Sequence, residues 1–395
     1  MGPKNSRARV GEDTGKVGNY FTSEKTHLDF ISSGCQLLDL VLGGGYAVRR
    51  VSNVVGDNST GKSLLAIEAC ANMAHKYPEG DIWYHEVESA FDTAYAETLG
   101  MPVDKISFVR DIHKEYDTVE GWFAFMENKV LTRKSKHPGL YILDTQDYLS
   151  DNAEKGRDIG KGTFGQDKNQ QLNRLYRQHI RAIEASNIHL MVISQTRENI
   201  GATFGRKWRV TGEGSLKFAA SQRIQLVERG KMKATYRSLE KVYGLNIAAN
   251  CFKNKVGLAH RTCEFPLYFG FGIDSNEASL RWLKQVKALD ELGIGEGLTY
   301  KDVQELDKSA LEKLCTTELT MQNPKTETRS RMKELLCEHW ELTPKGRKKS
   351  PGGIDALCES LRETKDPEME KKIFDLVAKT WAEIEEHFLP KRSKY

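Results

Sequence analysis

The run VSNVVGDNSTGKS, from Val51 to Ser63, constrains the fold more than any other part of this 395-residue chain. Its short apolar start, Val51 to Val55, predicts a buried strand, and apolar residues at helical spacing follow from Leu64 to Met73. The glycine-framed segment between them matches the pattern G-x-x-x-x-G-K-[ST]. That pattern counts as a phosphate loop only where it joins a strand to a helix. Because both flanking elements are predicted, the sequence indicates a phosphate-binding loop.

The chemistry of such a loop follows from its residue types. Gly56 and Gly61 let the backbone bend and approach an anion closely, and the loop N–H groups with the helix N-terminus attract phosphate oxygens. Lys62 adds a full positive charge, and the Ser63 hydroxyl is a ligand for Mg²⁺. A chance match in a chain of this length is expected at about a few per cent. The candidate phosphate-binding residues are Gly56, Asp57, Asn58, Ser59, Thr60, Gly61, Lys62 and Ser63.

Composition excludes several other classes of protein. Hydrophobic residues make up 39% and charged residues 29%, which is typical of a soluble globular protein with an adequate core. The net charge is only +4, so a nucleic-acid site must come from local clusters of basic residues. Apolar runs stay short of the ~20 residues that a membrane span needs. The seven cysteines are dispersed without a C-x-x-C pair, which favours reduced thiols in a cytoplasmic protein over zinc ligands.

Strands and helices alternate after the phosphate loop, which predicts an α/β fold with a mainly parallel sheet covered on both faces. Ligands of such sheets bind at the carboxyl ends of the strands. Glu86, Glu88, Asp144 and Gln195 all fall at such ends. The expected strands are 51–55, 81–87, 106–109, 140–144 and 189–194, and the expected helices are 64–73, 93–100, 119–134 and 169–186.

The pattern changes beyond Ile224. Strands are expected at 224–228, 243–250 and 264–268, with hairpin-like turns around Gly230 and Gly244. Apolar residues then recur at helical spacing in 300–316, 327–341 and 368–388. We therefore predict three parts: a flexible N-terminal segment at 1–30, a core at 31–285 and a small, mainly helical C-terminal domain at 286–395.

Two carboxylate positions are candidates for catalysis beside the phosphate loop. Asp144 ends a buried apolar strand, and this position favours a Mg²⁺ ligand. Hydrolysis also needs a group that orients and deprotonates water. Glu86 and Glu88 both qualify, since period-two alternation places them on the same side of a continuing strand. The pattern alone does not separate them.

Two long segments rich in glycine and charge, 150–168 and 196–214, interrupt the alternation. Long loops inside a compact domain are typically functional or disordered. The second segment mixes basic residues with Phe204 and Trp208. Basic side chains hold phosphates and aromatic faces stack on unpaired bases, so the mixture favours single-stranded nucleic acid.

Several blocks of the chain, with order and spacing kept, resemble the RecA family of recombinases. These are Ile31 to Ser63, Glu88 to Tyr95, Gln195 to Phe218 and Phe252 to Lys255. The resemblance runs from about Ile31 to Trp282. It implies a RecA-like ATPase core that uses ATP and Mg²⁺, the latter held by Ser63 and Asp144.

The resemblance also implies roles for individual residues around ATP. Glu88, not Glu86, is expected to position the attacking water. Asp92 and Tyr95 are expected to contact adenine, Tyr95 by stacking. Gln195 is expected to sense the γ-phosphate. Lys253 and Lys255 are expected to reach the ATP of a neighbouring subunit and to supply positive charge in trans, as an arginine finger does.

The two loop segments correspond to the DNA-binding loops of the family. Glu213 stands where the family carries glycine, and the second loop is more basic and aromatic than the family pattern. The resemblance implies DNA contacts at Phe164, Arg177 in the preceding helix, Arg197, Ile200, Gly212 and Glu213. The basic and aromatic composition of the second segment adds Arg206, Lys207, Trp208 and Arg209.

The function that the resemblance implies is a DNA-dependent ATPase that pairs single-stranded DNA with homologous double-stranded DNA and exchanges strands. Its expected form is a homo-oligomeric helical filament in the cytoplasm, in a prokaryotic or viral setting, without a membrane partner. Residues 1–30 lack the family's N-terminal docking helix. This motivates one alternative, a nucleotide-switched recombination accessory protein. A second alternative is a ring-forming DNA helicase-type motor built on the same core.

Overall fold

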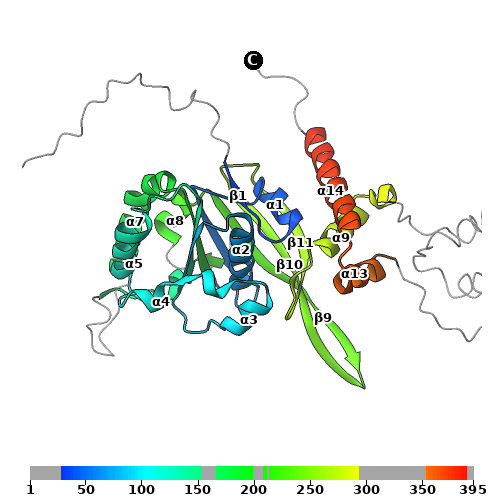
Figure 1. Cartoon of the computed structure of the whole chain (residues 1–395), viewed down its shortest axis with the longest axis horizontal. Helices are drawn as coiled ribbons and strands as arrows, with labels where there is room; N and C mark the ends of the chain where they lie inside the picture. Colours follow the sequence, from blue (N-terminus) through cyan, green and yellow to red (C-terminus); the bar gives the residue numbers. More distant parts are fainter. Residues whose placement is uncertain (1–27, 153–165, 199–207, 211–212, 293–352, 389–395) are drawn as a thin grey trace, which may run out of the picture.

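A ten-stranded sheet forms the centre of the molecule, and helices cover both of its faces (Figure 1). The computed structural model describes residues 28–152, 166–198, 208–210, 213–292 and 353–388. The main path of the sheet runs β12-β11-β10-β9-β3-β7-β6-β4-β5, and β8 pairs with β7. The predicted α/β class, with a mainly parallel centre, is confirmed.

The parallel part of the sheet is built around β3 (Val51–Gly56), which lies between β7 (Ile188–Glu198) and β9 (Gln222–Tyr236). β6 (Gly139–Asp144), β4 (Asp81–Glu86) and β5 (Ser107–Phe108) extend it on the β7 side. The helices in the connections are α2 (Lys62–Lys76), α3 (Thr93–Thr98), α4 (Val109–Ile112), α5 (Val119–Phe125), α7 (Gln166–Ala185) and α8 (Glu213–Ala219).

Register brings the carboxyl ends of four strands together. Gly56 of β3 pairs with Gln195 of β7, and Glu86 of β4 pairs with Asp144 of β6. The first pair opens the phosphate loop, and the second supplies two buried carboxylates. The edge of the sheet therefore gathers the candidate groups that the sequence distributes over more than a hundred residues.

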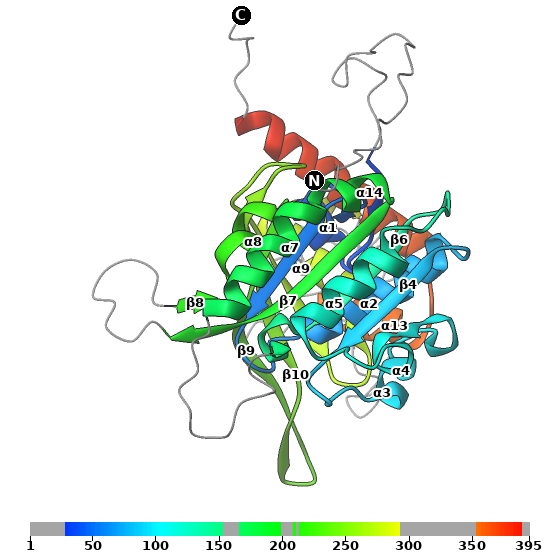
Figure 2. The same ribbon diagram turned by 90° about the vertical axis from the view of Figure 1, so that its left-hand side faces the viewer.

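Alternation along the buried strands divides the core into two layers. In β6, Leu140 and Ile142 pack on the side of α2, whereas Tyr141 and Leu143 pack on the side of α5, α7 and α8. Figure 2 shows α5, α7 and α8 together on one face of the sheet. Side chains of successive strand residues point to opposite faces, so an apolar run without alternation is expected where both faces are covered.

The antiparallel part of the sheet corrects one prediction. Gly230 and Gly244 do not form turns but lie inside β9 and β10 (Leu239–Asn254), next to register shifts in their ladder. The turn is instead at Arg237 and Ser238, which have φ values of 49° and 65°. The two strands project from the body as a long hairpin (Figures 1 and 2). Glycine inside a strand often marks a bulge, and the sequence alone does not distinguish a bulge from a turn.

The remaining strands lie at the antiparallel edge of this sheet or in a separate two-stranded sheet. β11 (Arg261–Tyr268) and β12 (Gly272–Ile273) extend the antiparallel part, and β1 (Phe30–Ile31) pairs with β2 (Tyr46–Ala47). α1 (Gln36–Leu42) ends at Gly43, whose φ of 86° is the left-handed conformation that glycine favours at the end of a helix.

Helices near the C-terminus pack directly on this body. α9 (Ser275–Gln285) contacts α13 (Gly353–Glu363) and α14 (Pro367–Phe388), and α14 also contacts α1. Their buried apolar side chains belong to the same cluster as those of α1 and α2. The helix expected at 368–388 is confirmed, while those expected at 300–316 and 327–341 lie outside the described residues. The domain boundary at residue 286 stays a prediction.

Within the described ranges, each helix is too short or too polar to span a bilayer.

Candidate nucleotide-binding and catalytic site

The phosphate loop joins β3 to α2, the context that its motif requires. Gly61 has a φ of 86°, a left-handed conformation that favours glycine. A Cβ atom there would lie 2.6 Å from Leu267 Cδ1, and a Cβ atom on Gly56 would lie 2.5 Å from Thr60 Oγ1. Close packing therefore favours glycine at both positions, and at Gly61 the backbone conformation favours it too. Neither Leu267 nor its strand was identified as part of the site from the sequence.

Lys62 begins α2 and turns back over the loop. Its Nζ donates a hydrogen bond to the Asp57 carbonyl oxygen at 2.6 Å. Burial lowers the pKa of Lys62, while the nearby carboxylates, led by Asp144 and Glu88, oppose this shift. The ammonium group thus lies among acidic groups at the edge of the sheet, where a triphosphate would supply the negative charge that now comes from carboxylates.

Asp144 meets the requirements for a Mg²⁺ ligand. Its side chain is buried, and Oδ2 accepts a hydrogen bond from Tyr84 Oη at 2.7 Å. Oδ1 is buried without a hydrogen-bond partner among the described residues. Burial raises the pKa of Asp144, and the hydroxyls of Tyr84 and Ser63 act against that shift. A buried carboxylate oxygen beside a serine hydroxyl suits Mg²⁺, which is held by one or two protein oxygens together with phosphates.

Glu86 and Glu88, which the residue pattern left open, have different environments. Glu86 accepts a hydrogen bond from the Ala90 backbone N–H at 3.0 Å and forms an ion pair with Arg110 at 3.5 Å. Glu88 lines the cavity above the phosphate loop. Burial and the charge of Asp144 raise the pKa of Glu88, which suits a group that accepts a proton. Glu86 holds a turn and lines only a smaller cavity beside this one, whereas Glu88 lines both cavities.

Gln195 connects Glu88 to the strand that leads toward the second loop segment. Its Nε2 donates to Glu88 Oε1 at 3.0 Å, and its backbone N–H donates to Asp147 Oδ2 at 2.8 Å. Thr196, the next residue, donates a hydrogen bond from its hydroxyl to the Asp57 carboxylate. The sequence predicted that Gln195 lies at the end of its strand, and this is wrong. β7 continues to Glu198 because it pairs there with β8 (Trp208–Val210).

Asp147 and Thr196 were missed by the sequence reasoning. Asp147 lies three residues after Asp144, and a polar residue so close to the end of a central strand was an available signal. No comparable signal marked Thr196, because its role depends on the contact with Asp57.

A cavity of about 480 Å³ extends from the phosphate loop along the end of the sheet. Tyr95, 37% exposed, lies on its wall, and Leu245, Leu267 and Phe269 contribute apolar side chains from β10, β11 and the residue that follows β11. A planar base could stack on Tyr95 in such a space. Asp92 is the N-cap of α3, and its Oδ1 accepts from the Tyr95 backbone N–H at 3.1 Å. Asp92 therefore fixes the helix that carries Tyr95, and it lines an adjoining cavity of about 170 Å³.

Lys253 and Lys255 lie away from this cavity. Lys253 Nζ donates to the carbonyl oxygen of Lys217 at 2.5 Å, and Lys255 Nζ donates to that of Phe218 at 3.4 Å. Both acceptors are in α8. Burial, with the charges of Lys255 and Arg223, lowers the pKa of Lys253 to about 8. Two cations at one helix end do not contact the phosphate loop of their own chain.

The candidate DNA-binding residues are described in part. Arg177 is exposed on α7, and Gly214 packs against Asn173 one turn earlier in that helix, which brings the start of α8 close. Glu213 is the first residue of α8. In the hairpin of β7 and β8, Arg197 pairs with Arg209 and Glu198 with Trp208. The two segments are thus not wholly irregular, because their described ends belong to strands and helices. Phe164, Ile200, Arg206, Lys207 and Gly212 lie outside the described residues.

Comparison with known proteins gives a consistent match. The model of the RecA N-terminal domain matches residues 10–274. Protein RecA of one strain of Prochlorococcus marinus is 27% identical over 323 residues, which are 78% of this chain and 80% of that protein. Protein RecA of Borrelia hermsii is 30% identical over 279 residues, 70% of this chain and 74% of that protein.

Proposed function

The chain belongs to the RecA family of recombinases, and on that premise we propose that it is an ATP-dependent recombinase. In this proposal it binds single-stranded DNA, pairs it with homologous double-stranded DNA and exchanges strands. The observation that carries the proposal is the hydrogen bond from Gln195 Nε2 to Glu88 Oε1, at 3.0 Å. It joins a candidate catalytic carboxylate to the strand that continues into a candidate DNA-binding segment.

The residues around the cavity divide the work of ATP hydrolysis. Lys62 and the loop N–H groups hold phosphate oxygens, and the apolar wall with Tyr95 accepts the base. Glu88 orients the attacking water and accepts its proton, a role that its raised pKa favours. Ser63 and Asp144 hold Mg²⁺, which when bound supplies positive charge beside the phosphates. Gln195 exchanges its hydrogen bond with Glu88 for one with the γ-phosphate.

That exchange is the proposed link between ATP and DNA. Gln195 is held by its neighbours at both its backbone and its side chain, and Thr196 contacts the phosphate loop. A shift of Gln195 therefore moves the hairpin of β7 and β8, in which Arg197 and Arg209 are paired. Contacts of basic residues with phosphates dominate DNA affinity, so binding should weaken steeply with salt.

The proposed assembly is a homo-oligomeric filament. Lys253 and Lys255 do not line the cavity of their own phosphate loop. Their place at the end of α8 is accessible to a second copy. In a heterologous assembly each subunit would present its lysines to the cavity of the next, which gives a helix if the rotation does not close.

ATP turnover with and without single-stranded DNA tests the proposal directly. We expect DNA to raise turnover and ATP to raise DNA affinity. Strand exchange between a labelled single strand and a homologous duplex is then the decisive readout. Turnover that is indifferent to DNA would contradict the proposal.

Imaging of the ATP-loaded protein on a single strand separates the alternatives. Continuous filaments support the recombinase. Discrete monomers or dimers without strand exchange would favour the accessory protein, and closed rings that unwind a forked duplex would favour the helicase-type motor.

A further inference from the structure

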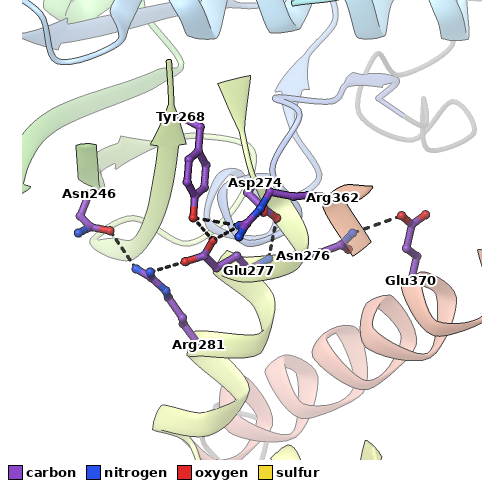
Figure 3. Close-up of polar contacts among 8 residues, drawn as sticks. All are labelled: Asn246, Tyr268, Asp274, Asn276, Glu277, Arg281, Arg362 and Glu370. Carbon is purple, nitrogen blue, oxygen red and sulfur yellow. Dashed lines mark hydrogen bonds and ion pairs between the residues drawn. The ribbon is translucent and has the colours of Figure 1, made fainter. Parts of the chain in front are cut away.

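Helix α13 presents one arginine to the outer side of β11 and the start of α9 (Figure 3). Arg362 Nη1 donates hydrogen bonds to Tyr268 Oη at 2.9 Å, to Asp274 Oδ2 at 2.9 Å and to Glu277 Oε2 at 2.7 Å. Its guanidinium also lies over the Tyr268 ring, 4.7 Å from the ring centroid. One side chain from the C-terminal helices thus joins two elements of the core.

Arg362 compensates the negative charge of two buried carboxylates, Asp274 and Glu277. The side chains of Asp274 and Glu277 are only 5% and 4% exposed. Glu277 has a second cation, because Arg281 pairs with its other oxygen. Asp274 has a different second contact, the N-cap hydrogen bond from the Glu277 backbone N–H to Oδ1 at 2.8 Å. Removal of one partner from a buried ion pair leaves an uncompensated charge, and the surrounding backbone must then adjust.

Tyr268 and Asp274, two partners of Arg362, belong to residues 267–274, a segment that packs against the phosphate loop. Leu267 and Phe269 line the nucleotide cavity, while Tyr268 between them points toward Arg362. Leu267 also packs closely on Gly61. At the far end of the segment, the Ile273 N–H donates to Glu68 Oε1 of α2 at 3.4 Å. Residues 267–274 therefore lie between the C-terminal helices and α2, the helix that begins at Lys62 of the phosphate loop.

We propose that Arg362 is a positioning residue that sets the affinity for ATP by holding residues 267–274 against the phosphate loop. This inference rests on the proposed nucleotide site. It makes the helix pair α13–α14 a part of the nucleotide-binding unit, and it gives Arg362 no contact with the nucleotide itself.

The test compares Arg362→Ala with Arg261→Ala in the full chain. Arg261 forms a hydrogen-bonded ion pair with Glu385 of α14, so both variants remove an arginine that ties β11 to the C-terminal helices. Arg261 opens β11, however, whereas Tyr268 closes it beside the cavity. A loss that followed only from weaker docking of the helices would affect both variants alike.

Equilibrium binding of ATP with Mg²⁺ and the kinetics of turnover provide the readouts. We expect Arg362→Ala to weaken ATP binding by about fivefold or more, within the usual range for coupling between sites. The KM for ATP should rise while kcat stays within about twofold, because the wall contributes binding that is equal in ground and transition states. Arg261→Ala should leave the KM for ATP and kcat within about twofold of wild type, because among the described residues Arg261 shares no partner residue with the nucleotide cavity.

Conservative variants extend the test in case Arg362→Ala does not fold. Arg362→Lys keeps the charge but loses the planar group that lies over the Tyr268 ring, so an intermediate KM is expected. Tyr268→Phe keeps the ring and removes the hydroxyl between Arg362 and Glu277, and a smaller rise in KM is expected.

The outcomes distinguish this inference from the proposed function. If Arg362→Ala folds and binds ATP as the wild type does, or if Arg261→Ala weakens binding equally, the inference is overturned. Wild-type protein that binds no ATP would instead overturn the proposed function.

Discussion

Lys62 with its surrounding carboxylates forms a first cluster, and Lys253 with Lys255 forms a second, and among the described residues these two occupy opposite electrostatic settings. Lys62 is surrounded by carboxylates of its own chain, with Asp144 and Glu88 opposing the fall of its pKa. Lys253 has another lysine and an arginine as its charged neighbours, and its pKa falls to about 8. The first cluster is matched by negative charge within one subunit. The second donates hydrogen bonds to neutral carbonyl oxygens of α8.

In the proposed assembly, this difference separates a complete half of the site, built by one chain around Lys62, from an incomplete half, Lys253 and Lys255, that needs a second copy. The phosphate loop, the candidate Mg²⁺ ligands Ser63 and Asp144, and Glu88 come together at or just after the carboxyl ends of β3, β6 and β4. The cations of Lys253 and Lys255 gain a matching anion when another molecule supplies one. If that anion is a neighbour's triphosphate, ATP affinity and subunit assembly are coupled. The predictions below test each side of this comparison, beginning with the largest effect.

Removal of the first cation should abolish turnover. Lys62→Ala takes away the ammonium group that lines the cavity, and we expect kcat/KM for ATP to fall by about 10³-fold or more. The measurement is steady-state phosphate release in the presence of single-stranded DNA. Thermal unfolding should confirm that the variant is folded. A folded Lys62→Ala protein with normal turnover would show that this loop does not hold the phosphates.

Removal of the second cluster should be rescued by a neighbour. Lys253→Ala/Lys255→Ala should lower turnover by about 10³-fold, the lower end for a charge supplied in trans. Mixed with Lys62→Ala, it should recover turnover, since one variant keeps the cavity and the other keeps the lysines.

An equal mixture should reach about a quarter of wild-type turnover, because about one in four random head-to-tail contacts joins an intact cavity to intact lysines. The control is each variant mixed with buffer. A mixture no more active than its parts would mean that the lysines act within one chain or not at all.

Glu88 and Glu86 provide a narrower test of the complete half of the site, the half around Lys62. Glu88→Gln removes the proton acceptor but preserves shape, and hydrolysis should slow by about 10²-fold or more while ATP still binds. Glu86→Gln is the matched control, because Glu86 is occupied by Ala90 and Arg110 and should tolerate the change with turnover near normal. Single-turnover hydrolysis and ATP binding measured on both variants separate catalysis from affinity. Equal loss in both variants would contradict the assignment of Glu88.

The sequence predicted the complete half far better than the incomplete one. The phosphate loop and Asp144 could each be predicted from a local pattern, because the loop motif directly follows its strand and Asp144 is the last residue of its own apolar strand. Choosing Glu88 over Glu86 needed the family resemblance, and the structure now adds the contacts that separate them. Leu267 and Phe269 were missed, since their place in the site depends on strand order and packing, whereas Asp147 was missed although it lies only three residues after Asp144. Gly230 and Gly244 were misassigned for a related reason, because a bulge is defined by the partner strand.

The smallest expected effect is a pH dependence that belongs to the second cluster. With a pKa of about 8, the Lys253 ammonium is fully charged well below that pH and loses its proton as pH rises through it. A neighbour's triphosphate would favour the charged form and raise the pKa, so turnover at saturating ATP should fall with a midpoint at or above pH 8. Lys253→Arg stays protonated throughout this range and should flatten the profile above about pH 8. Parallel profiles for the two proteins would show that the lost activity comes from another group. The Lys62 cluster would then have to account for the whole alkaline limb, although its carboxylates favour its charged form.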